Sequence, residues 1–274
     1  MYKEQHTIAE AYRELGQYKK ANRIEECSQR TFVRESVDYS TGEVTRTKLG
    51  KHRCHSSLCP ICLQTKANYE RYIGYNILSE LTKEYKVLSL TITMESVPIS
   101  EARKRITQLH TVFRKLRRDK HFISYLHGYA SRIEWGAINE EGLINLHLHA
   151  LLFVKGSILG RAWVSSLKLS DLVQQYADID YYPQCSIHKV GNNNIQKTLN
   201  YIVKEQSIDN SFIKELDFQL KKTKLFSYGG VYKEYRNNFI QQQKQNNKLS
   251  NSTNDTLYNV KNDIIDNFVS FSTN

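Results

Sequence analysis

The sequence contains no long apolar run. None of its segments approaches the roughly 18 to 20 consecutive apolar residues that a membrane-spanning helix needs. The N-terminal segment also has no apolar core of signal-peptide length. We therefore expect a cytoplasmic protein that has no membrane partner. In that reducing compartment the five cysteines are not expected to form disulfides, and clustered cysteines there indicate metal binding.

Acidic residues are scarce relative to basic ones. Aspartate and glutamate number 28 against 39 lysines and arginines, which gives a formal net charge of +11. A basic protein attracts polyanions, because each phosphate that it neutralises releases condensed counterions. The balance favours a nucleic acid as partner, although generic basicity would give the same count.

The 274 residues suffice for one sizeable catalytic domain with a small appendage at each end. Apolar periodicity predicts helices over residues 2–26, 68–85, 98–118, 161–177 and 195–205. Runs of β-branched and apolar residues predict strands over residues 87–93, 128–138, 143–154 and 183–190. We expect three regions, namely an N-terminal helical and zinc-binding region (1–67), a catalytic domain (68–237) and an Asn-rich flexible tail (238–274).

Two histidines, His147 and His149, stand two positions apart in an expected strand. Side chains alternate across a strand, so both imidazoles point to the same face. Two imidazoles on a rigid strand make half of a metal site. A pair of structural histidines gives the same pattern, so the spacing alone is modest evidence.

The hairpin between the two longest expected strands predicts a third ligand. If its loop, residues 139–142, pairs Ile138 with Leu143, counting outward pairs Glu134 with His147. Directly opposed residues share a face of the sheet, so Glu134 would lie beside the histidines. A mixed histidine and carboxylate site with open positions suits Mn²⁺ or Mg²⁺. A slip of one residue in the register would turn Glu134 to the other face, where it would be an ordinary exposed carboxylate.

A tyrosine and a lysine follow on the expected helix 195–205. Tyr201 and Lys204 are three residues apart and therefore occupy neighbouring positions on the helix surface. A phenol is a poor nucleophile at neutral pH, and a metal-polarised phosphate with a nearby ammonium group would lower the barrier to its attack. Because the chain has 18 tyrosines, this spacing alone is weak support for a nucleophile. The support comes from its position after the expected hairpin with the two histidines, a helix and a further strand.

Four cysteines gather in the first quarter of the chain. Cys59 and Cys62 form the C-P-x-C loop that is typical of zinc knuckles, and Cys54 and Cys27 complete four thiolates. His52 and His55 are alternatives for the fourth ligand. A closed thiolate shell leaves no open coordination position, so we expect a structural zinc. The fifth cysteine, Cys185, is expected to be a packed thiol.

A run of basic residues lies on the expected helix 98–118. A solvated helix face is the commoner reading of such a run, and a DNA-facing surface is the alternative. The candidates for DNA binding are Arg114, Lys115, Arg117 and Arg118.

Taken in order, these motifs resemble the rolling-circle plasmid replication initiators of the HUH endonuclease superfamily, in the branch with a cysteine cluster ahead of the catalytic domain. The resemblance spans about residues 24–236. It is carried by the four cysteines, the strand 87–91, Glu134, the His-Leu-His run, Tyr201-Ile202-Val203-Lys204 and Phe226-Ser227-Tyr228-Gly229-Gly230-Val231.

The resemblance implies a fold and a mechanism. The fold would be α+β, ferredoxin- or RRM-like, with an antiparallel sheet and helices mainly on one face, preceded by a small zinc-binding segment. Tyr201 would nick single-stranded or hairpin origin DNA, keep the 5′-phosphate and free a 3′-hydroxyl for host polymerase, with a host helicase as a further partner. His147, His149 and Glu134 would hold the divalent metal, and Lys204 would stabilise phosphate charge.

One residue departs from the pattern of this branch. Many members carry an acid four positions before the tyrosine, and Lys197 stands there. Nicking therefore carries over better than glutamate-assisted termination. The alternatives are a relaxase or transposase with the same motifs, and a non-enzymatic zinc-containing DNA-binding regulator. The absence of a helix-turn-helix or tandem-finger pattern weakens the regulator.

Overall fold

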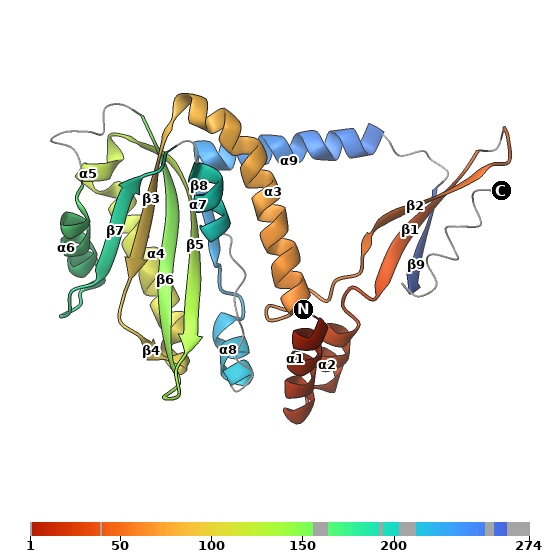
Figure 1. Cartoon of the computed structure of the whole chain (residues 1–274), viewed down its shortest axis with the longest axis horizontal. Coiled ribbons are helices and arrows are strands. Elements are labelled where there is room, and N and C mark those ends of the chain that lie inside the picture. The colour runs from red at the N-terminus through yellow and green to blue at the C-terminus, as the bar shows by residue number, and fades with distance from the viewer. Residues whose placement is uncertain are drawn as a thin grey trace. The chain divides into compact units, whose positions relative to one another are not determined.

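In a computed structural model the chain forms two compact units (Figure 1). The structure describes residues 2–38, 40–155, 164–191, 194–202, 212–249 and 255–261. The smaller unit combines residues 1–65 with 241–274, and the larger unit spans residues 66–240. No helix in these ranges is both long and apolar enough to span a membrane.

The smaller unit begins with two helices where the sequence predicted one over residues 2–26. Helix α1 (Tyr2–Glu14) ends before Gly16, which adopts a left-handed φ of 71°, and α2 (Tyr18–Glu25) follows. Glycine takes that conformation without steric cost, so the chain turns there and the two helices pack against each other. Their contact buries Ile8, Tyr12 and Ile24.

A three-stranded antiparallel sheet follows in the smaller unit, with strand order β2-β1-β9. Strands β1 (Arg30–Val37) and β2 (Val44–Lys51) form a hairpin. Strand β9 (Asp255–Lys261) pairs with β1 along its whole length. The sequence interpretation placed this segment in a flexible tail because asparagine and glutamine dominate the residues before it. The run Thr-Leu-Tyr-Asn-Val is strand-forming, and pairing with β1 satisfies its backbone groups.

The larger unit is built on an antiparallel sheet with strand order β7-β3-β6-β5-β8, and β4 also pairs with β6. The strands are β3 (Lys86–Thr93), β4 (Val97–Pro98), β5 (Leu126–Ile138), β6 (Leu143–Val154), β7 (Gln184–Lys189) and β8 (Phe226–Gly230). The α+β class with an antiparallel sheet is confirmed. Strand β6, which carries the two histidines, lies in the centre of the sheet.

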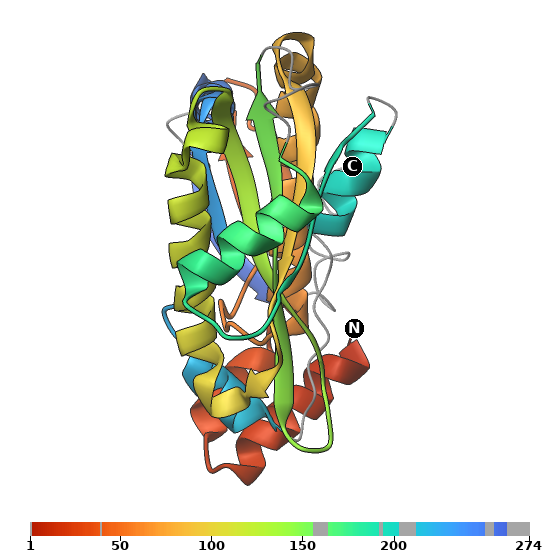
Figure 2. The ribbon, with the colours of Figure 1, turned by 90° about the vertical axis from the view of Figure 1, so that its left-hand side faces the viewer.

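Helices lie against both faces of this sheet, whereas the resemblance placed them mainly on one (Figure 2). One face of the sheet bears His147 and His149, and we call it the histidine face. On it, an apolar cluster joins Leu151 and Phe153 of β6 to three helices, α3 (Pro60–Glu84), α7 (Ile195–Ile202) and α9 (Val231–Leu249). The opposite face is covered by α4 (Ala102–Arg118), which buries Ile106, Leu109 and Phe113. The remaining helices are η1 (Ile99–Glu101), α5 (Lys120–Ile123), α6 (Ser166–Ala177) and α8 (Ile213–Leu220). Strand β6 carries apolar side chains on both faces of the sheet, so helices must pack on each face to bury them.

The turn from β8 into α9 requires glycine. Gly230 has a left-handed φ of 55°, and a Cβ there would collide with the backbone carbonyl of His127. Its neighbour Gly229 lies under the ring of Tyr129, which a Cβ would also strike. These two glycines let α9 fold back over the sheet, where Tyr232 is buried against Phe153.

Candidate active site and cysteine cluster

The two histidines lie side by side on the central strand. His147 and His149 project from one face of β6, with ring centroids 6.1 Å apart. Leu148 between them points to the opposite face and is fully buried. His149 is only 5% exposed. The strand alternation therefore has the outcome that the sequence predicted.

Two threonines of the neighbouring strand β3 contact these rings. Thr91 pairs with His149 and Thr93 with His147 across the sheet. Their hydroxyls lie 3.0 Å and 2.9 Å from the Nδ1 atoms of His149 and His147. When Nδ1 donates its proton to a hydroxyl, Nε2 keeps its lone pair for a metal. The sequence interpretation missed this role, although the two threonines repeat the two-residue spacing of the histidines.

Burial favours neutral imidazoles at this site. Loss of solvent lowers the pKa of His147 below its ordinary value. For His149, burial first and then the neighbouring charges of His147 and Arg132 together lower the pKa to about 4. A neutral imidazole is the form that binds a metal, so the donors suit this use near pH 7.

Glu134 lies directly across from His147, in the register that the hairpin count predicted. One of its carboxylate oxygens lies 3.7 Å from His149 Nε2. Nearer the loop the register differs, because Ile138 pairs with Ile144 rather than with Leu143. An irregularity between Trp135 and Ile138 absorbs the difference, so Glu134 still reaches the histidine face.

A buried arginine completes this group of side chains, and the sequence interpretation did not select it. Arg132 is 5% exposed and lies across from His149. Its Nη1 lies 3.6 Å from a carboxylate oxygen of Glu134, and its guanidinium carbon lies 4.9 Å from the ring centre of Phe226. Its spacing of two from Glu134 on a strand was the available signal. The site thus holds one fixed cation beside three potential metal ligands.

The candidate metal ligands are less tightly gathered than the cysteines. Within the described ranges, the four cysteines are the one group of three or more potential ligands whose donor atoms all lie within 4.8 Å of one another. Two neutral imidazoles and one carboxylate nevertheless form a donor set that fits Mn²⁺ or Mg²⁺ with open positions.

Helix α7 carries Tyr201 and packs on the histidine face of the sheet. Its Leu199 is buried in the cluster beneath α3. At the contact with α3, a Cβ on Gly74 would lie 2.6 Å from a methyl group of Leu199, so glycine allows the two helices to approach closely. The hydroxyl of Tyr75 donates a hydrogen bond to the side chain of Asn200.

The backbone of Tyr201 therefore follows two residues that are held against α3. The side chain of Tyr201 lies outside the described part of the structure, as do Lys204 and Glu205. Lys197, one helical turn before Tyr201, is exposed.

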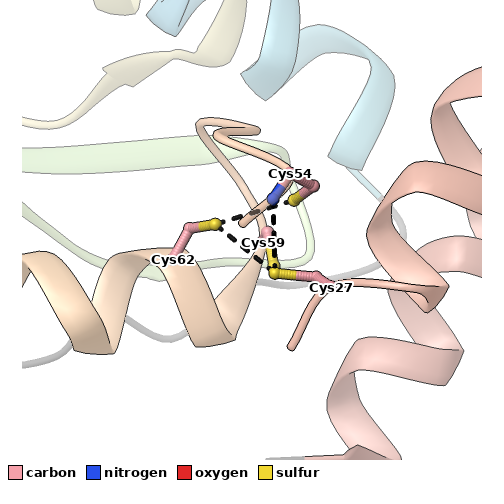
Figure 3. A group of neighbouring side chains, drawn as sticks. All are labelled: Cys27, Cys54, Cys59 and Cys62. Carbon is pink, nitrogen blue, oxygen red and sulfur yellow. Dashed lines mark hydrogen bonds between the residues drawn. The ribbon is translucent and has the colours of Figure 1, made fainter. Parts of the chain in front are cut away.

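The four predicted cysteines converge in the smaller unit (Figure 3). The sulfur of Cys62 lies 3.6 Å from that of Cys27 and 3.6 Å from that of Cys54. Four sulfurs at about 2.3 Å from a tetrahedral zinc would be about 3.8 Å apart, so the spacing fits such an ion. The backbone amide of Cys54 also points to the sulfur of Cys27 at 3.5 Å. The group can hold a metal ion.

Cys27, rather than either histidine, belongs to this group. The ring of His52 instead lies beside Phe32, with ring centroids 6.4 Å apart. Hydrogen bonds from Cys54 and Cys59 lower the pKa of Cys62, which favours a thiolate there. Cys185 lies in β7, and burial raises its pKa to about 11, which keeps that thiol protonated.

The four basic residues proposed to face DNA have different surroundings in α4. Arg117 stacks over the ring of Tyr129 at 4.1 Å, and Lys115 donates a hydrogen bond to the carbonyl of Tyr176. Both side chains thus stabilise the packing of the helix. Arg114 and Arg118 are exposed on the helix surface.

Comparison with known proteins gives a consistent result. The family described as "Replication protein" matches residues 46–274. "Protein rep" of Lentilactobacillus hilgardii is 28% identical over 253 residues, covering 82% of this chain and 77% of the relative. "Protein rep" of Lactiplantibacillus plantarum is 27% identical over 241 residues, covering 76% and 75%. The protein of the same name from Streptococcus pneumoniae is 27% identical over 247 residues, covering 84% and 75%. No solved structure matches the chain significantly.

Proposed function

Because the chain belongs to the replication protein family, we propose that it initiates rolling-circle plasmid replication by nicking single-stranded origin DNA with Tyr201. One observation carries the proposal. Two neutral histidines share a face of the central strand, oriented by threonines, and the helix that bears Tyr201 packs on that same face. This arrangement brings a potential nucleophile and a potential metal site to one side of the sheet.

His147, His149 and Glu134 would hold Mn²⁺ or Mg²⁺. When bound, such an ion polarises a phosphate oxygen and stabilises the charge that develops in the transition state. The threonine hydroxyls keep both Nε2 atoms directed to the ligand side. Arg132 adds a second cation. Because two cations beside one carboxylate leave an excess of positive charge, the site favours an anionic substrate such as a phosphodiester.

In the proposed reaction the phenolate oxygen of Tyr201 attacks the scissile phosphorus. A bond forms between that oxygen and phosphorus, and the bond to the 3′-oxygen breaks. The 5′-phosphate stays on the tyrosine, and the 3′-oxygen takes up a proton and becomes the primer for host DNA polymerase. Lys204 would stabilise charge on the phosphate. A host helicase would supply further single strand.

Joining at termination would reverse this chemistry, with a 3′-hydroxyl attacking the phosphotyrosine. A hydrolytic ending that uses an acid one helical turn before the nucleophile is not part of the proposal, because Lys197 occupies that position. The reversible route needs no such acid, since the attacking hydroxyl and the leaving phenol exchange roles.

The cysteine cluster would bind a structural zinc. Four sulfurs fill a tetrahedral shell, so that ion has no open position for substrate. It would link the end of α2, the residues after β2 and the start of α3, and so hold the smaller unit together.

A covalent capture assay tests the proposed activity. Wild-type protein is incubated with Mn²⁺ and labelled single-stranded origin DNA, then denatured and separated by electrophoresis. We expect a denaturation-resistant adduct with the wild type and none with Tyr201→Phe, which removes only the hydroxyl. If wild type forms no adduct, or Tyr201→Phe forms as much, the nicking proposal is wrong, and a non-enzymatic zinc-containing regulator becomes the better reading.

A relaxase or transposase would give the same adduct. The origin substrate separates them, because a replication initiator must leave a 3′-hydroxyl that a DNA polymerase extends on a circular template. We expect extension products longer than one template circle. A cleaved strand that is only transferred to a second DNA end would favour the alternative.

A further inference from the structure

We propose that a groove beside the histidine pair binds the sugar-phosphate backbone of the DNA strand that flanks the scissile phosphate. The identity of the ligand rests on the proposed function, whereas the groove itself is a feature of the larger unit. Its volume is about 590 Å³, within the range of about 300 to 1,000 Å³ that is usual for ligand sites.

The groove lies between the sheet and helix α7. Ser89 and Thr91 of β3 and His188 of β7 line it from the sheet. On the other side it is lined by Asn194, just before α7, and by Lys197 and Thr198 of α7. Ser89 lies directly across from His188 in the sheet, so the two side chains share the histidine face. Most of these lining residues belong to strands β3 and β7 or to helix α7, which hold their side chains at fixed positions.

Thr91 connects the groove to the proposed metal site. This threonine lines the groove and places its hydroxyl 3.0 Å from Nδ1 of His149. On the other wall, Lys197 precedes Tyr201 by four residues, one turn of the same helix. A strand whose scissile phosphate lies at His147 and His149 would therefore have a neighbouring nucleotide within reach of the groove.

The lining has the chemistry of a phosphate-binding surface. Lys197 is exposed and cationic, His188 is an exposed imidazole, and the hydroxyl and amide groups supply hydrogen-bond donors. No carboxylate is among the described residues that line the groove. Aromatic rings on which bases stack are also missing from that lining, apart from His188. Such a surface recognises the backbone of a single strand rather than its bases.

This assignment gives Lys197 a use. An acid at this position would repel a phosphate in the groove, whereas an ammonium group neutralises one. Lys197 thus supplies a phosphate contact one helical turn before Tyr201. We expect the contact to contribute to binding both before and after the strand is cut.

The groove is tested by the salt dependence of DNA binding in EDTA, where nicking is blocked. The probe is fluorescein-labelled oligothymidylate, and anisotropy gives the affinity at several salt concentrations. For Lys197→Gln we expect the slope of log affinity against log salt to become shallower by about 0.7, the value for one phosphate contact on a single strand. The same relation predicts an affinity loss of about fivefold at about 0.1 M salt.

Lys120→Gln is the matched control, because it removes one exposed lysine from α5, outside the groove. We expect it to keep the wild-type slope, and both variants to keep the wild-type unfolding temperature. Oligodeoxyadenylate should report the same loss for Lys197→Gln, since the groove reads no bases. If Lys197→Gln keeps the slope of Lys120→Gln, the groove does not bind the strand.

This result is independent of the adduct assay. A wild type that forms the covalent adduct while Lys197→Gln keeps the wild-type slope would overturn the groove alone. A wild type that forms no adduct, together with a shallower slope for Lys197→Gln, would overturn the nicking activity and leave the groove as a site for single-stranded DNA.

Discussion

The hydroxyl of Thr91 lies 3.0 Å from Nδ1 of His149, and the pair joins two adjacent strands of the central sheet. Thr93 and His147 repeat the relationship at 2.9 Å. An imidazole whose Nδ1 is fixed in this way presents Nε2 in one orientation, and such supporting contacts set both the tautomer and the basicity of the ligand nitrogen. The two strands thus define the candidate site together.

Thr91→Val should therefore weaken metal binding while leaving both histidines in place. Valine has nearly the same shape but accepts no hydrogen bond, so Nδ1 of His149 loses the threonine hydroxyl. We expect the affinity for Mn²⁺ to fall by about 10- to 100-fold, the usual effect of losing such a support. Titration with Mn²⁺ followed by electron paramagnetic resonance measures this. Thr91→Ser keeps the hydroxyl and should retain most of the affinity, and equal affinities for the two variants would contradict the positioning role.

Gly74→Ala should displace α7 and slow adduct formation. The added Cβ would lie 2.6 Å from a methyl group of Leu199, which is buried and has little room to move. Small displacements of a reacting group cost up to about 100-fold in rate, and we expect a loss of about 10-fold or more. The measurement is the rate of covalent capture. Gly74→Ala combined with Leu199→Ala should recover part of the rate, and a single variant as fast as wild type would argue against this contact.

Cys59→Ser should release the metal from the smaller unit. Three thiolates bind zinc less tightly than four, and the zinc energy is also folding energy. We expect zinc content to fall from about one ion per chain, and the unfolding temperature to fall by more than about 5 °C, which corresponds to about 1 kcal/mol in a domain of this size. Elemental analysis and thermal unfolding check this. Cys185→Ser is the control, and a loss of zinc in that variant would contradict the assignment.

Arg132→Gln should slow the chemistry without weakening the metal. Removal of a group that stabilises phosphate charge costs about 10²- to 10³-fold in rate. Loss of a cation beside Glu134 would at the same time relieve repulsion of a bound Mn²⁺, so its affinity should stay equal or rise. Single-turnover capture and Mn²⁺ titration separate the two effects. A fall in Mn²⁺ affinity would instead assign Arg132 to holding Glu134.

The sequence predicted the features of the site that depend on neighbouring residues better than those that depend on distant ones. Strand alternation is local, and it placed His147 and His149 on one face. The pairing of Glu134 with His147 needed a register over the hairpin, and the predicted pair is present although the count near the loop was wrong. Ile138 pairs one residue away from the predicted position, and the irregularity before it restores the predicted register at Glu134. Counting residues along the sequence does not reveal such an irregularity.

Other features depend on partners that are distant in sequence. Thr91 is 58 residues from His149, and Gly74 meets Leu199 over a longer span. Of the expected tail, residues 238–274, the structure describes residues 238–249 and 255–261. Asparagine and glutamine suggested a flexible tail, whereas α9 continues to Leu249 and β9 joins the smaller sheet. The exposed edge of a sheet can pair with a strand-forming segment from elsewhere in the chain. Because β1 and β9 are far apart in the sequence, no local pattern predicts that they pair.

Acidification should destabilise the metal-free protein through His149. Its folded pKa of about 4 lies below the ordinary value of 6.5, because burial and nearby positive charge disfavour the imidazolium. As pH falls, the unfolded chain therefore takes up this proton first. The stability is fully present above about pH 6.5 and is lost progressively between about pH 6.5 and 4, by up to about 3 kcal/mol.

Urea unfolding in EDTA over this pH range measures that loss. His149→Gln has no such proton to bind, so its stability should change less with pH than that of the wild type, while carboxylate titration affects both proteins alike. Added Mn²⁺ should shift the loss in the wild type to lower pH, since the ion binds only the neutral ring. Parallel pH profiles for wild type and His149→Gln in EDTA would show that His149 is not held neutral by its surroundings.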